Sequence, residues 1–109
     1  MSRLQELVRE FDRARGWHEV KPEHTFLHMV EELGEVAREL LSSVGYKHVD
    51  GNLKSELADL TLLLYKLADQ LGIDLESAAL EKLAENERRY PLEYSKLEME
   101  RYLKHRDED

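Results

Sequence analysis

The chain has 109 residues, no cysteine and a formal net charge of −8, with 41% hydrophobic and 37% charged residues. This length predicts a single domain, 1–109, with a modest core. The lack of cysteine excludes disulfides and thiolate metal sites, and the negative charge argues against nucleic-acid binding, which needs a basic face. No leader-like apolar segment and no apolar run of membrane length occurs, so we expect a soluble, cytoplasmic protein that binds no membrane.

The first half of the chain predicts helices separated by short breaks. Apolar residues at helical spacing predict a first helix over 2–14, followed by a loop. A second helix is predicted over 23–44, because Gly45 can end it in the left-handed conformation. A third helix is predicted over 53–71, with Asn52 as its N-cap.

The second half of the chain is also expected to be helical. Asp74 can cap a fourth helix, which should end near Tyr90, before Pro91. Residues 93–105 are expected to form a last helix within a charged tail, 93–109, that frays. Since no stretch alternates with the two-residue period of a strand, the sequence predicts an all-α bundle of four to five helices.

The predicted second helix carries a row of polar side chains opposite its apolar face. His28, Glu32, Glu35 and Glu39 cluster on that polar side. Taken alone, this pattern is that of an amphipathic helix with a solvated acidic face. In this interpretation the carboxylates bind no cation.

The predicted third helix favours a different interpretation of the carboxylates. It is apolar almost all round, which indicates a buried helix, yet Glu56 and Asp59 lie in it one turn apart. Burying an unpaired carboxylate is unfavourable, so a cation is expected nearby: a Lys or Arg, or a divalent metal that prefers oxygen ligands, such as Mg²⁺ or Mn²⁺. One chain of this size cannot cover such a helix, so we expect a core shared across a homodimer or homotetramer.

The two helices should bring their carboxylates together. A short connection predicts antiparallel neighbours, and each pair, Glu32 with Glu35 and Glu56 with Asp59, projects from one side of its helix. Facing pairs would form a four-carboxylate site. A di-iron bundle is excluded, because it needs two Glu-x-x-His motifs and no histidine here has a Glu three positions before it.

The same residues resemble a known family. "EELGE" followed by "ELAD" resembles the EExxE…ExxD signature of MazG-like nucleotide pyrophosphohydrolases. "FDRARGWHEVKPEHTFLHMVEELGEVARELL" is similar to the opening of that family, and "KLAENERRYPLEYSK" is similar to its tail. The likeness covers roughly residues 11–96, and the layout is that of small single-domain members such as the dCTP pyrophosphatase type. Where those continue with a Trp-containing stretch this chain has "SSVGYKH", so the likeness does not extend to a preference for cytosine.

The resemblance implies an all-α, Mg²⁺-dependent enzyme, with Mn²⁺ as a possible substitute, that cleaves nucleoside triphosphates to monophosphate and pyrophosphate in nucleotide-pool housekeeping. It implies metal ligands at the four positions Glu32, Glu35, Glu56 and Asp59. Glu31 matches a motif glutamate, and either it or Glu35 could accept the proton of the attacking water. Three positions near the tail match residues that contact phosphate and nucleotide: Lys82, Asn86 and Arg89. Trp17 matches an aromatic residue that stacks on the base.

Other interpretations of these residues stay open. Lys82 and Arg89 could simply lie along the edge of the core, and Trp17 could fill the core. His28, one turn before Glu32, is either exposed or in contact with substrate. The chain could also be a hydrolase of the same superfamily for another substrate, such as phosphoribosyl-ATP, or a non-catalytic acidic interaction module. An interaction module would tolerate Asp59→Leu, whereas an enzyme would not.

Overall fold

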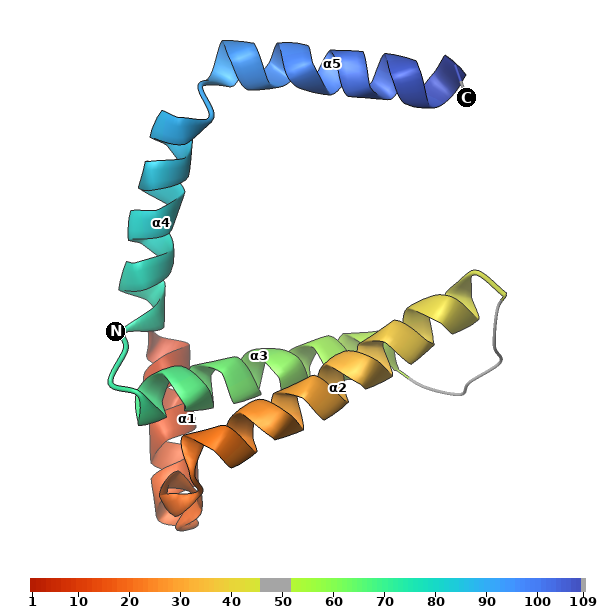
Figure 1. The fold of residues 1–109 in the computed structure, drawn as a ribbon. Coiled ribbons are helices and arrows are strands. Elements are labelled where there is room, and N and C mark those ends of the chain that lie inside the picture. Colours follow the sequence, from red (N-terminus) through yellow and green to blue (C-terminus); the bar gives the residue numbers. More distant parts are fainter. Residues whose placement is uncertain (46–51, 109) are drawn as a thin grey trace. The chain divides into compact units, whose positions relative to one another are not determined.

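The computed structural model describes residues 1–45 and 52–108, and within these ranges every regular element is helical (Figure 1). The five α-helices and one short 3₁₀-helix are α1 Arg3–Ala14, η1 Trp17–Glu19, α2 Pro22–Ser43, α3 Leu53–Gln70, α4 Leu75–Arg89 and α5 Leu92–Glu108. The predicted all-α fold is confirmed. Most of the predicted turn between the second and third helices, 46–51, lies outside the described residues.

Local sequence signals explain where these helices begin and end. The Asn52 side chain accepts a hydrogen bond from the Ser55 backbone N–H at 3.2 Å and caps α3, as predicted. Gly45 follows α2 with a φ of 82°, a left-handed conformation that glycine adopts without strain. The predicted loop after α1 contains the three-residue η1, which begins directly after Gly16, another left-handed glycine.

The chain divides into two compact units, Met1–Leu75 and Glu76–Asp109. In the first unit α2 and α3 lie side by side and antiparallel, as the short connection predicts, and α3 also packs against α1 (Figure 1). The second unit consists of the rest of α4 and α5.

Polar contacts fix α1 against the end of α3. Gln5 is fully buried; its Nε2 donates to the Ile73 carbonyl at 2.7 Å, and its Oε1 accepts from the Leu75 N–H at 3.0 Å. Arg9 pairs with Asp69 at 2.6 Å. These contacts hold in place the helices that carry the candidate site.

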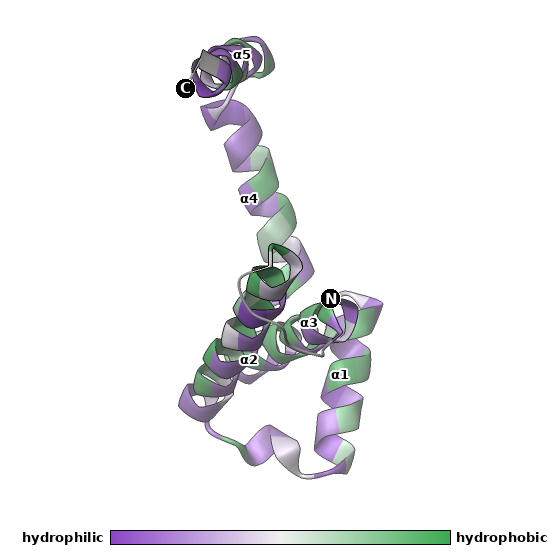
Figure 2. Ribbon diagram, turned by 90° about the vertical axis from the view of Figure 1, so that its right-hand side faces the viewer, coloured by the Kyte–Doolittle hydropathy of each residue, from purple (hydrophilic) through white to green (hydrophobic). Residues whose placement is uncertain are grey.

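The apolar face of α2 is mostly exposed within the single chain. Val36 is buried, but Phe26, Val30, Leu33 and Leu40 are each about half exposed, at 53%, 49%, 56% and 50%. Hydrophobic residues recur along α2 and α3 (Figure 2).

Glu32, on the acidic side of α2, is largely shielded from solvent. The Glu32 side chain is only 14% exposed, and the residues of α2 that are buried, Thr25 and Val36, flank it on the same side. The solvated acidic face considered above is therefore wrong for Glu32. None of the helices in the described part of the chain has the length and hydrophobicity needed to cross a membrane.

Candidate functional site

Three carboxylates meet between α2 and α3. Glu32 and Glu35, one turn apart on α2, and Glu56 of α3 each offer an oxygen atom, and these atoms all lie within 4.8 Å of one another. The antiparallel packing of the two helices produces this cluster, because each pair of acidic positions projects from one side of its helix. The sequence spacing predicted this meeting.

Two oxygens of this cluster are buried without a partner. Glu32 Oε2 and Glu56 Oε2 accept no hydrogen bond from any residue that the structure describes. The other Glu32 oxygen, Oε1, lies 3.5 Å from Nε2 of His28. Leaving a buried carboxylate oxygen unsatisfied is unfavourable, so the site favours a positively charged ligand.

Repulsion within the cluster changes the protonation of Glu35. The pKa of Glu35 is raised above its ordinary value of 4.5, first because the protonated carboxyl can hydrogen-bond to Glu56 and next because the Glu56 charge repels its ionised form. Desolvation and the nearby Glu31 raise it further, while Arg38 lowers it. Crowded like charges of this kind are relieved by a proton or by a metal cation.

The donor set fits a hard divalent cation. Three carboxylates supply only oxygen ligands, which Mg²⁺ and Ca²⁺ prefer, and the two unpartnered oxygens are available for coordination. Glu32, Glu35 and Glu56 could therefore hold such a cation.

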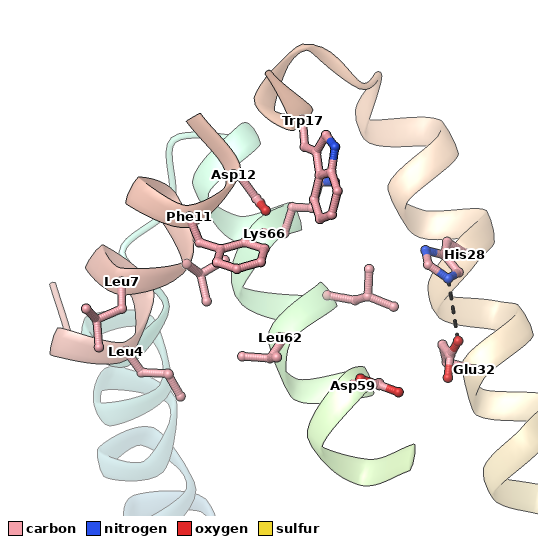
Figure 3. A pocket seen from close by; sticks show the side chains of 12 residues that line it. Leu4, Leu7, Phe11, Asp12, Trp17, His28, Glu32, Asp59, Leu62 and Lys66 are labelled. Atoms are coloured by element: carbon pink, nitrogen blue, oxygen red, sulfur yellow. Dashed lines mark ion pairs between the residues drawn. The ribbon is translucent and has the colours of Figure 1, made fainter. Parts of the chain in front are cut away.

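A pocket of about 500 Å³ adjoins this cluster in the first unit. This volume lies within the range of small-molecule sites. Glu32 belongs to both the cluster and the pocket (Figure 3). The lining comes from α1, η1, α2 and α3 and consists of Leu4, Leu7, Val8, Phe11, Asp12, Trp17, His28, Glu32, Asp59, Leu62, Leu63 and Lys66.

The two sides of the pocket differ in chemistry. Glu32 and Asp59 approach each other from α2 and α3 on one side, with His28 beside them (Figure 3). On the other side the rings of Phe11 and Trp17 meet edge to face, with centroids 5.7 Å apart and planes at 67°. Trp17 is 49% exposed and lines the pocket, so it does not fill the core.

Asp59 is placed differently from the sequence interpretation. The apolar neighbours of Asp59 predict a buried residue, but Asp59 is exposed in the single chain and lines the pocket. It lies outside the group of three carboxylates. Its role as a fourth metal ligand stays a prediction, and the argument from its burial is wrong because this side of α3 borders the pocket.

The remaining predicted residues are Glu31 on α2 and three residues of α4. Glu31 is exposed on α2, close enough to raise the pKa of Glu35. Lys82, Asn86 and Arg89 lie on α4 in the second unit. Within that unit Lys82 pairs with Glu85 at 3.3 Å. Their contacts with phosphate stay predictions.

Sequence reasoning missed several residues that line the pocket. On α3, Asp59, Leu62, Leu63 and Lys66 follow the i, i+3, i+4, i+7 spacing of one helix face, so this spacing could have identified Lys66. Asp12 is 8% exposed although it is charged, and its position one turn after the apolar Val8 could have distinguished it from Glu6 and Glu10.

Comparison with known protein families identifies the family of this chain. Among curated proteins, none matches the chain. A family model, described as the MazG-like family, matches residues 23–104. This range includes all three clustered carboxylates and Asp59. Since the match covers most of the sequence, the chain belongs to the MazG-like family.

Proposed function

We propose that this protein is a Mg²⁺-dependent nucleoside triphosphate pyrophosphohydrolase that releases a nucleoside monophosphate and pyrophosphate. Membership of the MazG-like family indicates activity of the nucleotide pyrophosphohydrolase type. The observation that carries the proposal is the cluster of Glu32, Glu35 and Glu56, which shares Glu32 with a pocket walled by aromatic residues. Metal-binding carboxylates suit the phosphate end of a nucleotide, and the aromatic wall beside them suits its base.

The carboxylates supply the metal-binding part of this mechanism. Glu32, Glu35 and Glu56 would hold Mg²⁺, with Asp59, which lies on the same side of the pocket as Glu32, as the fourth ligand. Mn²⁺ has similar ligand preferences and could replace it. Bound there, the metal would neutralise phosphate charge and make a coordinated water more acidic.

The other residues would bind the nucleotide and move a proton. A water that attacks the α-phosphorus must lose a proton, which Glu35 or Glu31 could accept; the raised pKa of Glu35 brings this base closer to neutral pH. Trp17 would stack on the base, and His28 would contact the nucleotide beside Glu32. For Lys82, Asn86 and Arg89 the resemblance to the family implies contacts with phosphate, a lysine as a point charge and an arginine as a fork.

Identifying which bond of the triphosphate is cleaved tests this function. Each nucleoside triphosphate should be incubated with the protein and Mg²⁺ in ¹⁸O-labelled water, and the products separated by chromatography. We expect the label in the monophosphate together with unlabelled pyrophosphate, because water attacks the α-phosphorus. Any diphosphate, or label in pyrophosphate, would contradict the mechanism. Turnover of phosphoribosyl-ATP alone would assign another substrate to the same site.

We also propose that the protein is a homodimer or homotetramer. Phe26, Val30, Leu33 and Leu40 leave a half-exposed apolar face on α2, and a second copy could cover it. Light scattering at micromolar concentration should give at least twice the monomer mass, and Leu33→Glu should reduce it. A wild-type protein that stays monomeric at that concentration would contradict this prediction.

A further inference from the structure

One carboxylate in the pocket has no role in the proposed hydrolysis. Asp12 of α1 is 8% exposed and lies on the aromatic side of the pocket, between Phe11 and Trp17 in the view of Figure 3. A charged group that is buried to this extent is usually paired. If a cationic side chain of the protein pairs with the Asp12 carboxylate, Asp12 stabilises the fold. If none does, the carboxylate is available to a ligand.

Two of the cations near Asp12 in the sequence, Arg9 and Arg15, have other partners. Arg9 Nε donates to Asp69 at 2.6 Å. Arg15 Nη1 donates to the Phe11 carbonyl at 3.0 Å, and its guanidinium lies 3.5 Å from the centroid of the Phe11 ring. Within the described ranges, no side chain forms a hydrogen bond or ion pair with the Asp12 carboxylate.

Lys66 is the cation on the same side of the pocket. Its Nζ lies 5.9 Å from the centroid of the Trp17 ring, and it forms no ion pair within 4.0 Å with any carboxylate that the structure describes. Together, Asp12 and Lys66 present a pure acceptor and a pure donor of hydrogen bonds beside an aromatic surface.

We propose that Asp12 and Lys66 select the nucleobase and that the base they select is guanine. This inference rests on the proposed function, because it takes the occupant of the pocket to be a nucleotide. The acidic side would hold the phosphate end, and the aromatic side would hold the base.

Hydrogen-bond chemistry favours guanine over the other bases. Guanine presents two adjacent donors, N1–H and the N2 amino group, which match the two oxygens of the Asp12 carboxylate. Its O6 accepts from the Lys66 ammonium. Adenine and cytosine offer only an amino group on this edge, beside a ring nitrogen that accepts. Uracil and thymine have a single N–H between two carbonyl oxygens, which would repel the carboxylate.

The arrangement of the pocket suits a purine nucleotide. Asp59 and Lys66 are seven residues apart on one face of α3, which is about 10 Å along a helix axis at 1.5 Å per residue. This length is comparable with the distance from an α-phosphate to the far edge of a purine. The rings of Phe11 and Trp17 offer stacking and edge contacts to the base.

Calorimetric binding of non-hydrolysable nucleotides tests the inference. The probes are α,β-methylene triphosphates of guanosine, adenosine, cytidine, uridine and xanthosine, with Mg²⁺ present. The wild-type protein should bind the guanosine analogue at least about tenfold more tightly than the others, as expected for a bidentate contact. Asp12→Asn should reverse this preference in favour of xanthosine, because the new amide donates to the C2 carbonyl of xanthine and still accepts from N1–H.

Matched variants separate recognition from folding. Glu10→Gln makes the same acid-to-amide change on an exposed position of α1 and should keep the guanosine preference. Lys66→Met should weaken guanosine binding about tenfold and leave the Asp12→Asn reversal unaffected when the two changes are combined. A misfolded variant would lose all binding and could not exchange one preference for another.

The outcomes distinguish this inference from the proposed function. Equal binding of all bases, no binding of any analogue, or loss of guanosine preference without a gain for xanthosine would overturn the role of Asp12, even if the enzyme hydrolyses triphosphates. Guanosine-selective binding that reverses in Asp12→Asn would sustain it, even if no pyrophosphate is released in the hydrolysis assay.

Discussion

Glu56→Gln is expected to lower kcat/KM for nucleoside triphosphate hydrolysis by about a thousandfold. Glu56 Oε2 is buried without a hydrogen-bond partner and belongs to the carboxylate cluster. Glutamine keeps the shape of the side chain, but it removes the negative charge that would hold the metal. Metal stabilisation of transition-state charge is worth several kcal/mol, and a loss of about 4 kcal/mol corresponds to about a thousandfold in rate. Steady-state kinetics with saturating Mg²⁺ would measure this effect.

Glu39→Gln is the matched control for this experiment. Glu39 lies on α2 one turn beyond Glu35 and outside the carboxylate cluster. The control should keep its kcat/KM within a few-fold of the wild-type value, since it also removes one negative charge from the same helix. Equal losses in both variants would show that overall charge, and not the cluster, governs turnover. If Glu56→Gln keeps its activity, Glu56 is not part of the catalytic site.

The fold and the cluster could be predicted because they depend on local periodicity. Helix ends followed from caps such as Asn52 and from Gly45, whose roles depend on a few neighbouring residues. The meeting of Glu32, Glu35 and Glu56 followed from i, i+3 spacing on two helices joined by a short connection. Both inferences need only the geometry of one helix and the direction of the next.

Two features could not be predicted in this way: which helix faces pack within the chain, and which residues form the aromatic side of the pocket. An apolar stripe does not indicate whether it packs within the chain, and the stripe of α2 that contains Leu33 is largely exposed. Asp59 was interpreted as buried because its neighbours are apolar, yet it borders a pocket. Asp12 and Lys66 lie 54 positions apart in the sequence, and only the packing of α1 on α3 places them in one lining.

Mg²⁺ should raise the melting temperature of the protein by roughly 10–20 °C at a concentration one hundred times its dissociation constant. The cluster exists in the folded chain, so a bound cation stabilises the folded state by mass action, by about 2.7 kcal/mol at this concentration. For a domain of this size, each kcal/mol shifts the melting temperature by roughly 4–8 °C. Differential scanning fluorimetry would measure the shift. Glu39→Gln should retain it, while Glu56→Gln should lose most of it.

Glu35→Gln should make the metal-free protein at least as stable as the wild type at pH 7. The pKa of Glu35 is raised in the folded state, chiefly through Glu56. The folded state therefore binds more protons than the unfolded chain between the ordinary value of 4.5 and the raised pKa, so the Glu35 contribution to the free energy of unfolding decreases as pH rises through this window. The free energy of unfolding of the variant does not decrease in this way, because glutamine does not ionise.

The pH dependence distinguishes repulsion from other causes. In chelator-treated samples, the melting temperature of Glu35→Gln minus that of the wild type should grow as pH rises from 4 to 7, and Mg²⁺ should then stabilise the wild type more than the variant. Glu39 lies outside the cluster, so the difference in melting temperature between Glu39→Gln and the wild type should change much less with pH. If Glu35→Gln is less stable than the wild type at pH 7 and Mg²⁺ shifts both proteins equally, Glu35 neither repels Glu56 nor binds the metal, because either interaction requires the charge that the variant lacks.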